Sequence, residues 1–290
     1  MSATVIISLD CEGKWGVADH LDASHDVIDS QRLHRAYERV FDILDTRKLP
    51  ATFAVVEMFR KERAELEELA AEGRIGAALP YTRPAWDAIA RNGDGWYAPW
   101  FDGMVTGRHE LATHGATHTP WDQLQGDSLA MELDLMGPLD GRTMVFPRNK
   151  VAHLPSLRAA GLLGYRAERV STPVRRLLSE LNPRSRPDQH VNGPAPLAIP
   201  SGRFVNWKSG GRRFIPTSLS VRRARHLLRA AADEFGVVHF WTHPVNFVTA
   251  PETLDVFEGI CDEIAGAVQA RKARVVTQRG YALERVVRAA

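Results

Sequence analysis

Two histidines, His114 and His118, are the residues of this chain whose type and spacing most directly suggest chemistry. They follow an apolar strand pattern in the segment Arg108-His-Glu-Leu-Ala-Thr-His-Gly-Ala-Thr-His118. Residues four apart on a helix lie on one face, about 6 Å apart at Cβ, so both imidazoles can bind one zinc ion at about 2.0 to 2.1 Å. The pair alone also fits a structural role, in which one imidazole caps a helix or is hydrogen-bonded in the core. The neighbouring motifs decide between these interpretations.

An acidic cluster lies in the segment Ser8-Leu-Asp-Cys-Glu-Gly-Lys-Trp-Gly16, at the end of an apolar, β-branched run. Its members Asp10 and Glu12 can supply a carboxylate ligand and a base. In an extended strand, residues two apart point to the same side, so both acids can face one site while Cys11 faces away.

Two further polar groups also follow apolar runs. Arg148, in Pro147-Arg148-Asn149, comes after the predicted strand 143–146, and His243 comes after the predicted strand 237–241. Parallel strands of α/β folds collect functional residues at their carboxyl ends. The histidine pair, the acidic cluster, Arg148 and His243 each follow an apolar run. Together they predict one catalytic face at one end of a parallel sheet.

The elements that must position these residues alternate between strands and helices. A strand at 4–9, a helix from Ser30 that stops before Pro50 and a strand at 51–56 form the repeating unit of parallel α/β folds. The same alternation predicts six to eight strands in all, in a barrel or an open doubly wound sheet. The other predicted strands cover 110–113, 143–146, 164–167, 237–241 and 274–277, and the other predicted helices cover 60–72, 129–135, 156–163, 220–235, 252–270 and a closing segment.

Residues 1–290 are predicted to form a single domain, because barrels of this size often form one unit. An irregular insertion is expected near 79–101, where the aromatic residues are expected to pack in the core or a lid. A long loop is expected near 170–211, which is rich in Pro, Arg, Asn and Gly and has no periodicity.

Composition excludes several classes of protein. Thirty-seven basic and 35 acidic residues leave a net charge of +2, which argues against a dedicated nucleic-acid partner, and Arg222, Arg223 and Arg225 are interpreted as a solvated helix face. Two cysteines argue against a disulfide framework. The N-terminus has no basic leader, and no apolar run approaches the roughly 20 residues of a membrane span. We therefore expect a cytoplasmic protein without a membrane span; the oligomeric state is not predicted.

The order of these motifs resembles the polysaccharide deacetylase family, also called the NodB-homology family or carbohydrate esterase family 4. The resemblance runs from about residue 4 to residue 284 and rests on the acidic cluster of the first strand, Leu49-Pro-Ala-Thr-Phe53, His114-Gly-Ala-Thr-His118, Phe146-Pro-Arg148 and Thr242-His243-Pro244. It implies an α/β fold, a distorted (β/α) barrel of parallel strands with outer helices. It also implies one divalent metal ion, held by an acid and two histidines, and hydrolysis of an N-acetyl group on a sugar.

Carried over to this chain, the resemblance implies that His114 and His118 are metal ligands, that Asp10 is the general base paired with Arg148, and that His243 is the general acid. The family commonly has two consecutive aspartates where this chain has Asp-Cys-Glu. We assign Glu12 as the acidic ligand, because its longer side chain can reach the metal and leave Asp10 free. The two roles reverse if the backbone turns sharply at the intervening cysteine, whose thiolate is a third possible ligand.

The resemblance thus predicts a metal-dependent carbohydrate deacetylase with zinc as its metal. Its predicted substrate is a small molecule or oligosaccharide that carries an N-acetyl sugar, such as a precursor of a surface polysaccharide like lipopolysaccharide O-antigen. The alternatives are a hydrolase of another small or cyclic amide and a non-catalytic sugar-binding relative. Candidate substrate contacts flank the motifs and comprise Trp15, Trp121, Asn149, Trp241 and Asn246.

Overall fold

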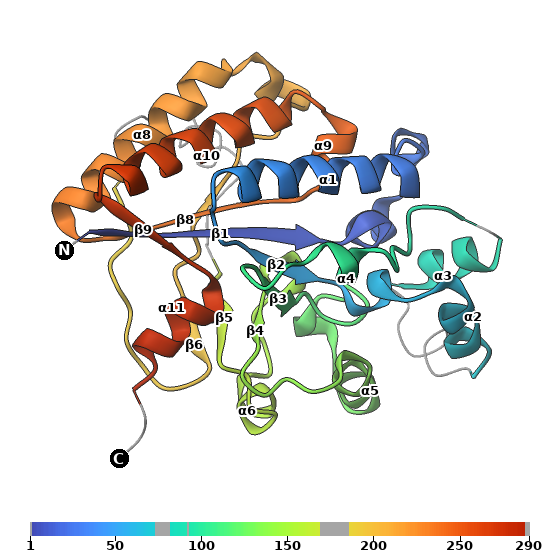
Figure 1. Cartoon of the computed structure of the whole chain (residues 1–290). Coiled ribbons are helices and arrows are strands. Elements are labelled where there is room, and N and C mark those ends of the chain that lie inside the picture. The colour runs from blue at the N-terminus through green and yellow to red at the C-terminus, as the bar shows by residue number, and fades with distance from the viewer. Residues whose placement is uncertain (1, 73–81, 92, 169–185, 288–290) are drawn as a thin grey trace.

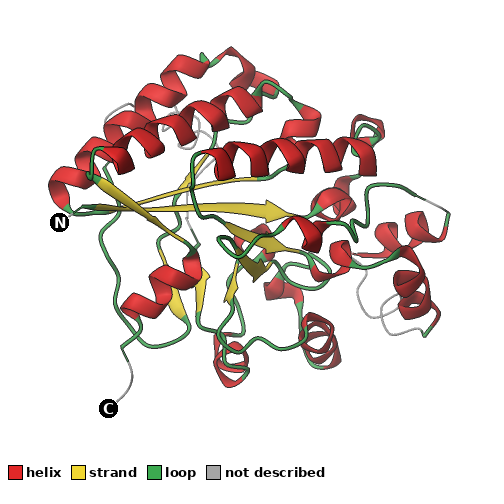
Figure 2. Cartoon of the chain, in the orientation of Figure 1, coloured by secondary structure: helices red, strands yellow, loops and turns green. Residues whose placement is uncertain are grey.

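The computed structural model describes residues 2–72, 82–91, 93–168 and 186–287 of the chain. Within these ranges, nine parallel strands form one sheet with helices on its outside (Figure 1; Figure 2). The strands are β1 (Ala3–Cys11), β2 (Thr52–Val55), β3 (Glu110–Thr113), β4 (Thr143–Met144), β5 (Gly164–Arg166), β6 (Leu197–Ile199), β7 (Arg203–Phe204), β8 (Val237–Thr242) and β9 (Ala273–Val276). The α-helices are α1 (Ser30–Thr46), α2 (Arg63–Ala71), α3 (Arg83–Ala90), α4 (Phe101–Met104), α5 (Asp127–Met136), α6 (Leu154–Ala159), α8 (Thr217–Glu234), α9 (Val245–Thr249), α10 (Thr253–Gln269) and α11 (Gln278–Arg285).

The long strand β1 lies at the centre of the sheet. It pairs with β8 on one side, and on the other side it pairs first with β9 and then, from Ser8 onward, with β2. The full order is β6-β5-β4-β3-β2-β1-β8-β7, and the sheet curls into a half-barrel. Among the described residues, no ladder joins β6 to β7. The structure therefore confirms the predicted distorted (β/α) barrel, which stays open between its two edge strands.

Helices cover the sheet because each carries one apolar stripe that must be buried. α1 shows this most clearly, since its Leu33, Tyr37, Val40 and Leu44 recur at three- and four-residue intervals and are all buried. α8 and α10 pack beside each other on the same side of β1 as α1, whereas α11 lies against β5 and β6 (Figure 1). Within the described residues, no helix has both the length and the apolar composition needed to cross a membrane.

Two segments that the sequence predicts to be irregular contain regular structure. β6 and β7 lie within the predicted loop near 170–211, of which 170–185 fall outside the described residues. These strands have three and two residues, which is too short for an alternating pattern to be read. α3 lies within the irregular insertion near 79–101, whose residues 79–81 and 92 are likewise outside the described ranges.

The aromatic residues of that insertion are packing residues, as predicted. Trp86 and Trp96 are buried and meet the edge of Trp15, with ring centroids 5.3 and 5.7 Å from it. The arginine cluster on α8 differs from the prediction, because Arg223 is buried while Arg222 and Arg225 are exposed. The periodicity of the helix turns the middle arginine inward.

The first helix begins at Ser30, as the sequence predicts, and its cap is the residue before. Asp29, not Ser30, is its N-cap, and the Asp29 Oδ1 atom accepts a hydrogen bond of 2.6 Å from the backbone N–H of Arg32. We expect Asp29→Ala to lower the free energy of unfolding by about 1 kcal/mol, because this N–H loses its partner. Urea unfolding measures the change. Arg32→Ala is the matched control, since it removes only the exposed ion pair to Asp29 and keeps the cap; an equal loss in both variants would contradict the capping role.

Candidate metal centre

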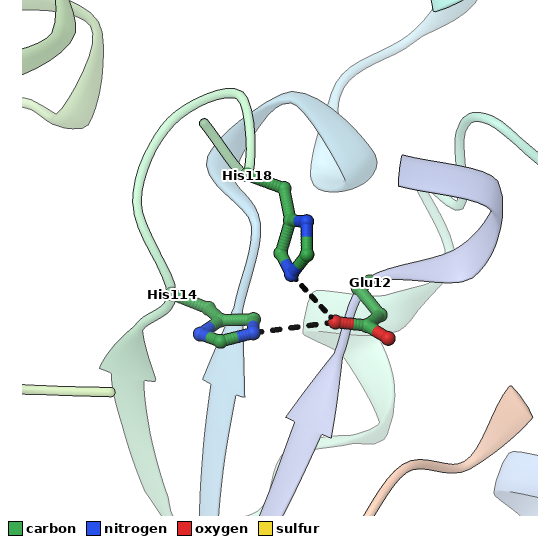
Figure 3. Close-up of side chains that lie close together, drawn as sticks. All are labelled: Glu12, His114 and His118. Carbon is green, nitrogen blue, oxygen red and sulfur yellow. Dashed lines mark hydrogen bonds and ion pairs between the residues drawn. The ribbon is translucent and has the colours of Figure 1, made fainter. Parts of the chain in front are cut away.

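Three buried side chains converge at the carboxyl edge of the sheet, namely Glu12, His114 and His118 (Figure 3). Glu12 follows β1, His114 follows β3, and His118 lies in the loop after it. The Oε2 atom of Glu12 lies 3.3 Å from His114 Nε2 and 2.9 Å from His118 Nε2. One ligand atom from each residue lies within 4.8 Å of the others. The group is therefore a possible site for one metal ion.

The hydrogen bonding of His114 shows that these atoms suit a cation. Its Nδ1 atom lies 2.7 Å from the carbonyl oxygen of Val145, and because a carbonyl only accepts, Nδ1 carries the proton. In the neutral imidazole, Nε2 then turns a lone pair toward Glu12. A lone pair and a carboxylate oxygen that face each other at 3.3 Å repel unless a positive charge lies between them. Two imidazole nitrogens and one carboxylate oxygen form a donor set that binds zinc in catalytic sites.

The charge state of Glu12 also fits a ligand. Burial alone would raise the pKa of Glu12, but the neighbouring imidazoles, His243 and His118 foremost, hold it well below its ordinary value of 4.5. The carboxyl group is therefore ionised. Cys11 faces away from the site and packs in the hydrophobic core, where burial raises the pKa of its thiol well above the ordinary value. This is the alternation that an extended β1 requires.

The segment from His114 to His118 is a loop, so the helical spacing expected from the sequence is wrong although the two imidazoles meet. Gly115 and His118 both have left-handed backbones, with φ angles of 78° and 60°. These turns bring the two rings to a centroid separation of 4.9 Å. A non-glycine residue keeps such a conformation only where its surroundings fix it.

Glu132 on α5 fixes this loop. Its Oε1 atom accepts hydrogen bonds from the backbone N–H groups of Ala116 and Thr117, at 2.7 and 3.2 Å. Its Oε2 atom accepts a third, of 2.8 Å, from the Thr117 hydroxyl. Burial raises the pKa of Glu132, and the three donated hydrogen bonds oppose the shift. A buried carboxyl group on a neighbouring helix thus sets the path of the chain between the two histidines.

Asp10 forms a buried ion pair with Arg166, the last residue of β5. The Arg166 Nη1 and Nη2 atoms donate to Asp10 Oδ1 and Oδ2 at 2.8 and 2.6 Å, and both side chains are almost fully buried. Burial would raise the pKa of Asp10, but Arg166, followed by His114 and His243, lowers it below its ordinary value of 3.8. Asp10 therefore stays ionised inside the barrel.

The predicted pairing of Arg148 with Asp10 is wrong. The Arg148 Nη2 atom instead lies 2.5 Å from Asp19 Oδ1 and 2.9 Å from the carbonyl oxygen of Gly16. Its backbone is left-handed, with φ of 55°, and its side chain is about one-third exposed. Arg148 thus lies at the mouth of the site, because β5 delivers a second arginine that reaches Asp10 through the barrel interior.

His243 follows β8 and lies beside both carboxylates. Its Nε2 atom is 3.7 Å from Asp10 Oδ2 and 3.8 Å from Glu12 Oε1, and its side chain is 24% exposed. A cavity of about 350 Å³ opens over this group. Besides the residues already described, its lining includes Phe146, Asn149, Lys150, Glu168 and Trp241.

The predicted substrate contacts divide into two groups. Asn149 and Trp241 line the cavity and can meet a ligand. Trp15 and Trp121 are fully buried packing residues, and Asn246 is nearly so, and the cavity lining includes none of them. A position next to a motif in the sequence therefore does not show whether a residue lines the cavity or packs in the core behind it.

Sequence reasoning missed Arg166 and Glu132. The predicted strand at 164–167 contains Arg166, and a charged residue inside a short buried strand is a signal that a partner is required. Glu132 carries a similar signal, because it is an acidic residue between the apolar residues of a predicted helix. Neither signal names the partner, which only the three-dimensional structure supplies.

Comparisons with known proteins agree with the fold. No family model matches the chain, and the search of curated proteins finds no related sequence. A solved structure from Mycobacterium smegmatis, provisionally described as a polysaccharide deacetylase, is similar to the chain with 16% sequence identity and a TM-score of 0.56. The alignment covers 98% of this chain and 90% of that one. This likeness shows that the two chains share a fold, the distorted (β/α) barrel implied by the sequence resemblance.

Two other solved structures are more distant. A family 4 carbohydrate esterase from Bacillus subtilis has 12% identity and a TM-score of 0.44, with 98% of this chain and 82% of that chain covered. A carbohydrate esterase domain of a xylanase, from the hindgut metagenome of Trinervitermes trinervoides, has the same identity and TM-score, with 98% and 91% covered. TM-scores at this level do not by themselves establish a common fold.

Gly16 tests the position of the Glu12 carboxylate. A Cβ atom at residue 16 would lie 2.0 Å from Glu12 Oε1, so Gly16→Ala must displace that carboxylate. We expect the variant to remain folded and to lose affinity for zinc by about 10-fold or more, measured by competition with a chelating dye. Gly103→Ala is the control, because nothing lies within 4 Å of its added Cβ. Unchanged zinc affinity in Gly16→Ala would show that Glu12 is not a ligand in this position.

Glu132 tests the loop between the histidines. We expect Glu132→Ala to lose about 10- to 100-fold in zinc affinity, whereas Glu132→Gln keeps an acceptor for the two backbone N–H groups and most of the affinity. Because the folded-state pKa of Glu132 is raised, its carboxyl group favours folding at low pH and loses this advantage as the pH rises through that value.

The pH dependence of unfolding provides the measurement. As the pH rises from about 5 through the raised pKa of Glu132, the metal-free parent should lose stability relative to Glu132→Gln, which cannot ionise. A parent that gains stability relative to this variant over the same interval would contradict the raised pKa.

Proposed function

We propose that this protein is a metal-dependent hydrolase of the polysaccharide deacetylase type, which removes an N-acetyl group from a sugar. One observation carries the proposal. The group formed by Glu12, His114 and His118 lies beside a second carboxylate, Asp10, and a partly exposed imidazole, His243, under a single cavity. Amide hydrolysis needs an electrophilic centre, a base and an acid at one place, and these five side chains can supply them.

The three ligands would hold one divalent metal ion, which we propose to be zinc. When bound, such an ion lowers the pKa of water and stabilises negative charge on the amide oxygen. Histidine nitrogens with one carboxylate favour zinc over magnesium or calcium, which prefer sites made of oxygen atoms alone. The Val145 carbonyl, by fixing the Nδ1 proton of His114, keeps the Nε2 lone pair of that residue available for the ion.

Asp10 is proposed as the general base. It is ionised, and both of its oxygens accept hydrogen bonds from Arg166, which fix the orientation of the carboxylate. A carboxylate oxygen has more than one lone pair, so Asp10 can still take a proton from the attacking water. Arg166 holds the pKa of Asp10 low. Asp10 therefore keeps the proton taken from the water only briefly and releases it readily.

His243 is proposed as the general acid. It approaches Asp10 from β8, on the side of the cavity that Trp241 lines, and it is the most exposed of the three histidines in the site. From this position its Nε2–H can donate a proton to the leaving nitrogen of the amide, and the resulting free amine departs into the cavity. Base and acid thus come from neighbouring strands, β1 and β8, whose register is fixed by their pairing.

A cavity of about 350 Å³ at the mouth suits one or two sugar rings. Trp241 offers an apolar ring wall, and Arg148 and Lys150 line the opening, where they pair with Asp19 and Asp122. We infer that the substrate is an N-acetyl sugar within a precursor of a surface polysaccharide, for which lipopolysaccharide O-antigen is one example.

Metal content and acetate release test the proposal together. We expect His114→Ala and Glu12→Ala each to lose the bound metal and to reduce acetate release by at least about 1000-fold, because the electrophilic centre is lost with the ligand. Bound metal is measured by elemental analysis, and acetate is measured with a panel of N-acetyl sugars, sugar phosphates and nucleotide-linked sugars. Metal content equal to that of the parent in both variants would refute the ligand assignment.

Two controls separate the proposed reaction from its alternatives. Asp10→Asn should bind metal and sugar as the parent does but release no acetate. Cyclic amides belong in the same panel, since turnover of these alone would show an amide hydrolase of another specificity. A parent that binds sugars and hydrolyses nothing would be a sugar-binding protein.

A further inference from the structure

A line of buried polar groups lies behind Asp10, on the side away from the cavity. It runs from the carbonyl oxygen of Pro200 through His239 and Ser8 to the guanidinium group of Arg166. The distances are 2.7 Å from Pro200 O to His239 Nδ1, 2.8 Å from His239 Nε2 to Ser8 Oγ, and 3.5 Å from Ser8 Oγ to Arg166 Nη1. His239 and Ser8 are fully buried. The proposed reaction uses neither residue.

Each proton in this line has a determined position. The Pro200 carbonyl only accepts, so His239 Nδ1 carries a proton. Burial, with the charge of Arg166, lowers the pKa of His239 to about 3, so the ring is neutral and its Nε2 accepts. Ser8 must therefore donate its only hydroxyl proton to His239. Its oxygen lone pairs are then left to face the Arg166 Nη1 atom, which donates.

The line joins two pairs of neighbouring strands, β5 with β6 and β1 with β8, that are far apart in the sheet order. Pro200 follows the edge strand β6, His239 lies in β8, Ser8 in β1 and Arg166 in β5. Three strands separate β5 from β1 in the sheet order, so these contacts cross the interior of the half-barrel. A Cβ atom at Gly202 would lie 2.5 Å from the His239 carbonyl oxygen, and glycine at this position lets the chain after Pro200 approach β8 closely.

Arg166 needs such a support. Within the described residues, its buried Nε atom has no hydrogen-bond partner. Its guanidinium plane is placed by Ser8 at Nη1, by Asn149 at Nη2 with 3.2 Å, and by the ring of Trp241, whose centroid lies 4.3 Å from the guanidinium carbon. Only one orientation of the plane lets both Nη atoms meet both oxygens of Asp10.

We propose that Ser8 and His239 are positioning residues, which act through Arg166 to hold the Asp10 carboxylate in its reactive orientation. A serine next to a histidine otherwise suggests a nucleophile and its base. That interpretation fails here, because both residues are fully buried and the cavity lining includes neither of them. The inference rests on the proposed deacetylase function, in which Asp10 is the base.

Single substitutions provide the first part of the test. Ser8→Ala and His239→Leu should lower kcat for acetate release by about 10- to 100-fold, which is the range found when a supporting hydrogen bond is removed from a catalytic group. KM and zinc content should stay within about twofold of the parent, because neither residue touches substrate or ligands. His239→Gln, which keeps an acceptor for Ser8, should recover part of the loss. His109→Leu is the matched control, a buried histidine at the start of β3, remote from the site.

A double-mutant cycle provides the second part. Arg166→Lys keeps the positive charge beside Asp10 but loses the two-pronged contact, and it should itself be slow. If Ser8 acts through Arg166, Ser8→Ala in the Arg166→Lys background costs less than about twofold in kcat, although it costs 10-fold or more in the parent. Equal costs in both backgrounds would overturn the proposal and show that Ser8 serves the fold alone.

The outcomes also separate this inference from the proposed function. A parent that releases acetate, with Ser8→Ala and His239→Leu as active as the His109→Leu control, refutes the positioning role and leaves the function intact. A parent that binds zinc and releases acetate from no substrate refutes the function. A spectroscopic measurement then still tests the placement of Arg166: the near-ultraviolet circular dichroism contributed by Trp241, isolated by comparison with Trp241→Phe, should change in Ser8→Ala. An unchanged Trp241 signal shows that Ser8 does not hold the guanidinium.

Discussion

The buried ion pair between Asp10 and Arg166 is the constraint on which the site depends. It joins the central strand to a strand on the far arm of the half-barrel, and both side chains are almost fully buried. Removing one partner of such a pair costs about 3 to 5 kcal/mol, because a charge is left buried and alone. That is a large share of the roughly 5 to 15 kcal/mol by which a domain is stable. The pair therefore fixes the position of β5 as firmly as it fixes the carboxylate.

Parallel strand order explains why so many polar groups meet at one edge. Every strand pair in the described sheet is parallel, so the carboxyl ends of β1, β3, β5 and β8 lie together. Their buried apolar residues form part of the core, and functional polar residues follow directly where β1, β3 and β8 end. Glu12, His114 and His243 are delivered in this way, by loops that begin at the same level of the barrel. The parallel sheet brings these residues close together, and the loops determine which way their side chains point.

The sequence predicts this convergence well because it depends on strand order and on residue type. Asp10, Glu12, His114, His118 and His243 all lie where the motifs place them, around one cavity. The predicted helix at the histidines is wrong, because the path of that loop is set by hydrogen bonds to Glu132 on a separate element, α5, which the spacing of the histidines does not indicate. The predicted partner of Asp10 is wrong for a similar reason. Arg148 belongs to the motifs of the resemblance, but Arg166 is the arginine that lies beside Asp10 in space. A contact across the barrel leaves no periodic pattern in the sequence of either strand.

Strands that are too short to show an alternating pattern are equally hard to predict from the sequence. β6 and β7 together contain five residues, and they lie in a stretch whose composition is typical of a loop. They form because each pairs with a neighbouring strand that is already part of the sheet. Their ends carry Pro200 toward His239 and Phe204 toward Trp241 and His243. Tertiary pairing, rather than local propensity, therefore decides the structure of this segment.

The spacing Asp-Cys-Glu gives two acids of similar chemistry two different surroundings. Alternation along β1 turns Asp10 and Glu12 to the same side and buries Cys11 in the core between them. Both acids have lowered pKa values, yet the neighbours that lower them differ: imidazoles surround Glu12, and a guanidinium group holds Asp10. Imidazole nitrogens are ligands that can share a metal ion with Glu12, whereas a guanidinium group can only donate hydrogen bonds and never binds a metal. The carboxylate facing two imidazoles is therefore suited to be a ligand, and the one facing arginine is left to exchange protons. The proposed roles of these two acids therefore follow from their partners and not from their order in the motif.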